Sequence, residues 1–148
     1  MGRMGQPYRY VNHTADVEFI ARGTTLEQAF KHALLALFNT MADTRRVGAL
    51  RMPPKRIKMI EHADSLSELL WRTLQDALSI TDAEALFPYR TSRLAVLRAN
   101  GRYALRAEIL AKPQTPECAG IYVKGVSRFD LKVSESAGGF SVSAVIDI

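Results

Sequence analysis

Apolar residues recur at steps of three and four in two stretches of the chain, a spacing typical of amphipathic helices. The first stretch predicts a helix over residues 25–42, with Thr24 or Thr25 in the capping position. The second predicts a helix from the capping residue Ser65 to about residue 80, with Trp71 off its stripe, at the edge of the core or on a partner-facing patch. The two stripes consist of Leu26, Ala29, Phe30, Ala33, Leu34, Leu37, Phe38 and Met41, and of Leu66, Leu69, Leu70, Leu74, Ala77 and Leu78.

Apolar and polar residues alternate elsewhere, which indicates half-buried strands. Asn100-Gly101 predicts a tight hairpin, because both central residues of a type I′ turn need a positive φ, and Gly138-Gly139 favours a second turn. Residues 43–54 are expected to form an exit loop. The expected strands are 8–11, 17–22, 55–60, 93–99, 102–111, 120–133 and 139–147. We therefore predict an α+β fold, a two-layer sandwich with two main helices packed on one face of a mainly antiparallel sheet.

Length and composition fit one domain over residues 1–148, with residues 1–7 as a disordered lead. The 47% of hydrophobic residues can form a substantial core, and the 24% of charged residues suit a solvated surface. No apolar run approaches the roughly 18–20 residues of a membrane span, and the first residues lack the apolar core of a signal peptide. The single Cys118 excludes an internal disulfide framework. These features together indicate a cytoplasmic protein that does not enter membranes.

The chain is basic, with a net charge of +5 and an isoelectric point near 9.6. Arginines are spread along it, and only residues 45–58 form a local basic stretch. This charge permits contact with RNA or with an acidic protein surface, although a solvated surface is the simpler interpretation. Any RNA contact is expected to be weak, non-specific and strongly dependent on salt.

Three carboxylates stand beside apolar segments. Asp16 precedes a strand, Asp43 follows the first predicted helix, and Asp147 ends the last strand, next to the terminal carboxylate of Ile148. A carboxylate at a helix C-terminus faces the negative end of the helix dipole, and the last two carboxylates repel each other. An arginine or a divalent cation would neutralise these charges. If the fold brings them together, they form an oxygen-lined site suited to a hard cation.

Several motifs, taken in their order along the chain, resemble the archease family. They are His13-Thr14-Ala15-Asp16, the segment Leu37 to Asp43, the segment Ser65 to Trp71, the segment Asp82 to Leu86, and Val145-Ile146-Asp147-Ile148. The chain departs from the family pattern at Glu18, where glycine is common, and at Ser127-Arg128-Phe129, where an aromatic residue and a histidine are common. The family is also often acidic.

The resemblance implies that Asp16, Asp43 and Asp147, with the terminal carboxylate of Ile148, hold a divalent cation: Ca²⁺, Mg²⁺ or Mn²⁺. His13 either joins this site or is hydrogen-bonded within its own turn. The resemblance also implies an accessory role rather than an enzyme activity. Archeases promote guanylylation and multiple turnover of RtcB-type tRNA and RNA ligases, and a role as chaperone of a tRNA methyltransferase has been proposed for the family.

Two other classes of function stay open from the residues alone. A metal-dependent hydrolase could use the same carboxylates, but no general base accompanies them. A basic RNA-binding module could use residues 45–58, but aromatic residues are not interleaved with the arginines as base stacking requires.

Overall fold

The computed structural model describes residues 6–11 and 16–148. The described chain forms strands, three α-helices and one short 3-10 helix. In chain order they are β1 (Tyr8–Val11), β2 (Asp16–Gly23), α1 (Leu26–Met41), α2 (Thr44–Ala49), β3 (Lys55–Ala63), α3 (Leu66–Ala83), β4 (Leu86–Ala99), β5 (Arg102–Pro113), η1 (Pro116–Cys118), β6 (Gly125–Val126), β7 (Lys132–Ser136) and β8 (Gly139–Asp147).

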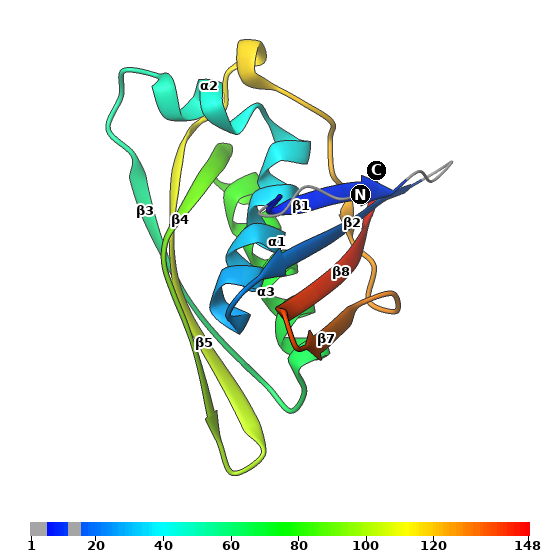
Figure 1. The fold of residues 1–148 in the computed structure, drawn as a ribbon. Helices are drawn as coiled ribbons and strands as arrows, with labels where there is room; N and C mark the ends of the chain where they lie inside the picture. Colours follow the sequence, from blue (N-terminus) through cyan, green and yellow to red (C-terminus); the bar gives the residue numbers. More distant parts are fainter. Residues whose placement is uncertain (1–5, 12–15) are drawn as a thin grey trace.

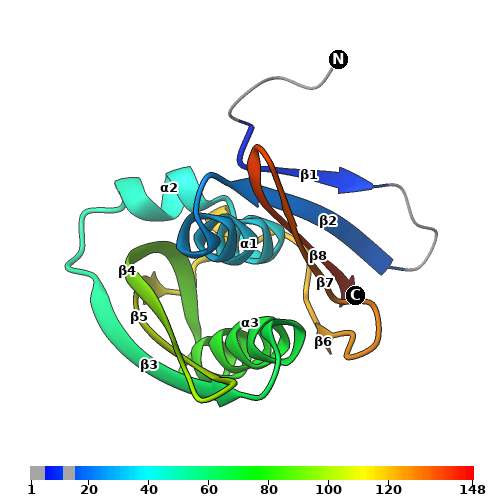
Figure 2. The same ribbon diagram turned by 60° about the horizontal axis from the view of Figure 1, so that its bottom comes forward.

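The predicted α+β class, with helices packed on antiparallel strands, is confirmed. The strands form two sheets rather than the single sheet of the expected two-layer sandwich, because among the described strands β3, β4 and β5 pair only with one another. One sheet has the order β1-β2-β8-β6, with β7 also paired to β8, and the other has the order β3-β5-β4. Helices α1 and α3 lie between the two sheets (Figures 1 and 2). Each sheet therefore has one face on the helices and one face turned outward.

Both main helices begin at the expected capping residues. The Thr25 hydroxyl accepts a hydrogen bond from the Gln28 amide at 3.1 Å, and the Ser65 hydroxyl accepts one from the Glu68 amide at 3.1 Å. Their apolar stripes form the core, as predicted. The largest fully buried side chains are Phe19, Phe30, Phe38, Leu34, Leu37, Leu69, Leu70, Leu74, Leu105, Ile109, Ile146 and Val47.

Three segments differ from the sequence prediction. The expected exit loop contains α2, which begins directly after Asp43. Strand β4 begins at Leu86 rather than at residue 93, because register shifts near Pro88 and Thr91 interrupt its alternation. Residues 120–133 are mostly irregular, since the amides of Gly120 and Ile121 bind carbonyls at the end of α1 instead of a strand. The predicted hairpin is present, with φ values of 54° at Asn100 and 75° at Gly101.

Glu61 is a buried carboxyl group on the inner face of β3. Its neighbours on that face are Ile57, Met59 and Ala63, and only 8% of Glu61 is exposed. Burial, followed by a hydrogen bond to Asp76 and the charge of Asp76, raises the pKa of Glu61 to about 8. The folded protein therefore keeps Glu61 protonated at pH values where the unfolded chain has lost that proton.

We expect the substitution Glu61→Gln to stabilise the protein at pH 8 and to leave its stability nearly unchanged near pH 4.5. Between those values the folded state binds more protons than the unfolded state, so this group lowers the free energy of unfolding as pH rises. Each unit of pKa difference corresponds to about 1.4 kcal/mol, so a gain of at least about 1 kcal/mol, or about 2–4 °C in Tm, is expected at pH 8.

Thermal unfolding of the wild type and of Glu61→Gln across this pH range checks the expectation. The exposed Glu135 on β7 provides the control substitution, Glu135→Gln, which should leave the pH slope unchanged. An identical pH slope in Glu61→Gln and in the wild type would show that Glu61 titrates normally.

Candidate metal centre

Asp16 and Asp147 lie directly opposite each other on paired strands. Asp16 is the first residue of β2, Asp147 is the last residue of β8, and the antiparallel register pairs their Cα atoms. Such partners are about 4.5–5.5 Å apart between Cα atoms, and their side chains share one face of the sheet. Val142, Ala144 and Ile146 of β8 lie in the core as the sequence predicted, but Val145 on the opposite face is buried as well, so the alternation of exposure is interrupted next to Asp147. The two carboxylates therefore project together from the outward face.

This pairing places two like charges side by side without compensation. Both residues are half-buried, and neither side chain has a hydrogen bond or ion pair with another residue in the described ranges 6–11 and 16–148. Like charges directly opposite in an antiparallel pair destabilise it. A bound cation would relieve the repulsion, and the oxygen donors match the preference of Ca²⁺, Mg²⁺ or Mn²⁺. In this respect the residues fit a hard divalent cation.

Asp43 has a different local role from the one expected. It caps α2, and its Oδ1 atom accepts hydrogen bonds from the amides of Arg45 at 3.2 Å and Arg46 at 3.3 Å. The positive end of α2 suits a carboxylate, so this capping offsets the unfavourable effect expected from the end of α1. Oδ2 takes no part in this capping and remains available as a ligand atom.

The segment from Cys118 to Val126 connects Asp43 with the Asp16–Asp147 pair. At one end the Asp43 amide donates to the Cys118 carbonyl at 2.8 Å, and the Gly120 amide donates to the Met41 carbonyl at 2.9 Å. At the other end the Lys124 amide donates to the Asp147 carbonyl at 2.8 Å. Figure 1 shows α2 and the end of β8 in the upper part of the molecule, on either side of the upper end of α1.

Within the described part of the chain, no three His, Cys, Asp or Glu side chains come together as a group that could hold a metal ion. The fold pairs Asp16 with Asp147 but does not bring Asp43 into the same cluster. Ile148 follows Asp147 and is partly exposed, whereas His13 lies outside the described residues. The metal site stays a prediction.

Trp71 and Gln75 of α3 hold the strand beside Asp147, a role that the sequence did not indicate for either residue. The indole of Trp71 donates to the Val126 carbonyl at 2.9 Å, and the Gln75 side-chain oxygen accepts from the Val126 amide at 2.9 Å. Gly125, the other residue of β6, pairs with Asp147 in the sheet. Trp71 is packed at the edge of the core, which confirms one of its two interpretations.

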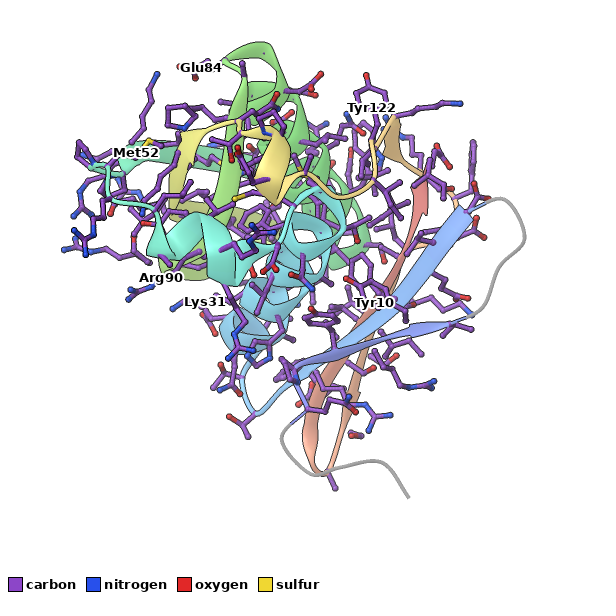
Figure 3. The ribbon with its side chains drawn as sticks, turned by 90° about the horizontal axis from the view of Figure 1, so that it is seen from above. Tyr10, Lys31, Met52, Glu84, Arg90 and Tyr122 are labelled. Atoms are coloured by element: carbon purple, nitrogen blue, oxygen red, sulfur yellow. The ribbon has the colours of Figure 1, made fainter. Side chains whose placement is uncertain are left out.

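The segment Ser127-Arg128-Phe129, which departs from the family pattern, follows directly after β6. The Arg128 guanidinium lies over the Trp71 ring, 4.4 Å from its centroid, and within 3.8 Å of a carboxylate oxygen of Glu68. Phe129 is 91% exposed, and with these residues it borders a surface hollow of about 470 Å³. Here Arg128 supports the indole that holds β6. Figure 3 shows Tyr122 projecting outward from the preceding part of this chain segment.

The architecture and the paired carboxylates define a small α+β domain with an acidic strand end. Residues 8–148 match the model of the archease protein family. The chain therefore belongs to the archease family. It is 29% identical over 150 residues to a protein archease of Methanosarcina mazei, with 100% of both chains covered. It is 31% identical over 150 residues to a protein archease of Pyrobaculum neutrophilum, covering 97% of this chain and 98% of that one.

Two solved structures share the fold. The solution structure of a Methanobacterium thermoautotrophicum protein superposes with a TM-score of 0.80 at 22% identity, covering 96% of this chain and 99% of that one. The crystal structure of a Thermotoga maritima archease, described as a possible chaperone, has a TM-score of 0.58 at 15% identity, with 100% of both chains covered. In the described part of the chain, none of the helices is both long and apolar enough to span a membrane.

Proposed function

We propose that this protein is a non-enzymatic accessory factor that activates an RtcB-type RNA ligase by promoting guanylylation and multiple turnover. Membership of the archease family supports the accessory role. The observation that carries the mechanism is the in-register pairing of Asp16 and Asp147, two carboxylates without another partner in the described chain. A bound cation would stabilise such a pair more than it would stabilise carboxylates that already have partners.

The proposed ligand set is Asp16, Asp147 and the carboxylate of Ile148; Asp43, which does not lie in the same cluster, is left out of it. When bound, a divalent cation would supply positive charge at the acidic strand end, for transfer to the ligase or for reorganisation of the ligase's metal pocket. Asp16 and Asp147 would hold it from paired strands. Trp71 and Gln75 would keep β6, and with it the end of β8, in position.

A second role, as chaperone of a tRNA methyltransferase, is also proposed. The description of the Thermotoga maritima structural relative as a possible chaperone favours it. Both proposed roles belong to RNA processing in the cytoplasm. Neither role requires this chain to catalyse a reaction.

The experiment combines the protein with the RtcB-type ligase of its own organism, GTP, Mn²⁺ and broken tRNA halves. With ligase at about one-tenth of the substrate concentration, we expect ligated product to exceed the amount of ligase only when the protein is added. The protein alone should neither ligate RNA nor hydrolyse GTP. Substantial GTP turnover by the protein alone, or unchanged ligase turnover, would contradict the proposal.

A further inference from the structure

The outward face of the β3-β5-β4 sheet gathers cations from all three strands. The register aligns Arg56, Leu110 and Arg90 in one row, and Lys58, Glu108 and Arg93 in the next. The third row places Arg106 between Ile60 and Ala95. We name the five cations Arg56, Lys58, Arg90, Arg93 and Arg106 the basic sheet face.

Within these rows the basic sheet face is only weakly neutralised. Glu108 stands in its middle, accepts hydrogen bonds from the Ser92 hydroxyl at 2.8 Å and from Arg56 at 2.8 Å, and has a pKa lowered by those bonds. Lys58 and Arg106 are exposed and have no hydrogen bond or ion pair with any other described residue. One carboxylate thus stands among five cations, which leaves a strong positive field at this surface.

Helix α2 and the loop after it extend the positive charge at one border of this face. Lys112 continues the outward alternation of β5 but is covered, since its ammonium group donates to the carbonyls of Gly48 at 3.0 Å and Leu50 at 2.9 Å. The exposed Arg45 and Arg46 lie on α2 itself. The basic stretch seen in the sequence therefore leads directly into the face.

The chemistry of the face fits a phosphate backbone better than a protein surface. A protein interface normally has an exposed apolar centre with a polar rim. Here Leu110 in the first row is buried, so it offers a protein partner no apolar contact surface. The exposed aliphatic residues, Ile60 at 61% and Leu97 at 59%, lie toward the hairpin end rather than in the middle. The same face of a second copy would present the same positive charge and be repelled.

The face also lacks a platform for unpaired bases. In the described rows its side chains are aliphatic or charged, and the aromatic Tyr103 belongs to the inward row with Ala63 and Arg98. Stacking on aromatic side chains is the usual means of holding single strands. Arginine forks, by contrast, match phosphate oxygens in a duplex, whose backbone is presented without unstacking.

We infer that the basic sheet face binds the phosphate backbone of duplex RNA without reading its sequence. The choice of RNA among polyanions rests on the proposed function. The position and mode of binding are inferred from the rows of cations on the β3-β5-β4 sheet. The β3-β5-β4 sheet lies on the other side of α1 and α3 from β2 and β8 (Figures 1 and 2), the strands that carry Asp16 and Asp147. In Figure 3, Arg90 and Tyr10 of β1 likewise stand on opposite sides of α1. RNA contact and cation binding therefore use separate surfaces.

The test measures fluorescence anisotropy of a labelled 16-base-pair RNA duplex and of a 16-nucleotide oligo(U) at 50, 100 and 200 mM KCl. We expect the full-length protein to prefer the duplex, with affinity falling about 100-fold over this salt range, as four neutralised phosphates would give. The double substitution Lys58→Ala/Arg106→Ala should weaken duplex binding at least tenfold at 50 mM KCl. It should also reduce the slope of log Kd against log salt by about two.

A matched control removes the same charge from the opposite sheet. Arg9 on β1 and Lys132 on β7 are both exposed, and Arg9→Ala/Lys132→Ala should leave duplex affinity nearly unchanged. Equal losses in both double variants would overturn the inference, because binding would then depend on net charge alone. Preference for oligo(U), absence of duplex binding at 50 mM KCl, or competition by polyglutamate as strong as by RNA would also overturn it.

The same two double variants separate this inference from the proposed function. Ligase stimulation by the wild type, combined with RNA binding that does not depend on Lys58 and Arg106, would refute the inference alone. RNA binding that maps to Lys58 and Arg106, with no ligase stimulation by the wild type, would refute the proposed function alone. A Tm unchanged from that of the wild type establishes that the exposed substitutions leave the fold intact.

Discussion

The substitution Asp147→Asn is expected to abolish ligase stimulation while leaving the protein folded. Asp147 faces outward at the end of β8, so its carboxylate contributes little to the core. Removing one of two opposed like charges should change stability by no more than about 1 kcal/mol, in the stabilising direction. Because the number of ligand charges sets the affinity for a hard cation, Mn²⁺ binding should weaken at least about tenfold.

Thermal unfolding in the absence of metal, calorimetric titration with Mn²⁺ and ligation turnover measure the three parts of this prediction. Asp147→Ala should behave in the same way, and Asp16→Asn should match it because Asp16 is its direct partner. The control Glu135→Gln removes an exposed carboxylate from the neighbouring β7 and should bind Mn²⁺ as the wild type does. An Asp147→Asn protein that stimulates the ligase fully would remove Asp147 from the site.

The substitution Gly120→Ala should produce the second large effect, without altering a single carboxylate. A Cβ atom at Gly120 would lie 2.5 Å from the Thr40 carbonyl oxygen and 3.2 Å from that of Met41. These carbonyls accept the amides of Ile121 and Gly120, so the added methyl group forces the connecting segment away from α1. Overpacking of this kind costs about 1–3 kcal/mol, which corresponds to a fall in Tm of about 2–4 °C per kcal/mol.

The displacement should also weaken Mn²⁺ binding, since the same segment is hydrogen-bonded to the backbone of both Asp43 and Asp147. Gly138→Ala is the matched control, because a Cβ atom at Gly138 meets no atom within 4 Å. Its Tm and Mn²⁺ affinity should stay at the wild-type values. If Gly120→Ala and Gly138→Ala unfold at the same temperature, the predicted steric conflict at Gly120 does not lower the stability, and this prediction is wrong.

The parts of the fold that could be predicted from the sequence are those with a single strong local signal. The apolar stripe and the capping hydroxyl of Thr25 fixed α1 to within one residue at each end, and Asn100-Gly101 located the hairpin. The strand prediction for residues 120–133 failed because alternation describes only side chains. The backbone amides at the start of this segment bind carbonyls at the end of α1, which lie far away in sequence. The division into two sheets likewise depends on pairings that no local pattern contains.

The candidate site, like the fold, could be predicted from the sequence only in part. Its composition was visible, because carboxylates beside apolar strands are unusual, and the register of β2 with β8 brings Asp16 and Asp147 together. The capping role of Asp43 was not visible, since no sequence pattern predicted the short six-residue helix that begins directly after it. The basic sheet face was hidden for a third reason, because its cations come from three strands whose register only the structure shows.

The most direct test of the proposed activation is covalent guanylylation of the ligase. In that step the ligase histidine attacks the α-phosphate of GTP, the adduct with GMP forms, and pyrophosphate leaves. Ligase, radiolabelled GTP and limiting Mn²⁺ are incubated with the wild-type protein, with Asp147→Asn or with neither, and labelled ligase is quantified. We predict that the wild type raises the labelled fraction several-fold and that Asp147→Asn leaves it at the level of ligase alone. Equal labelling in all three reactions would contradict the account.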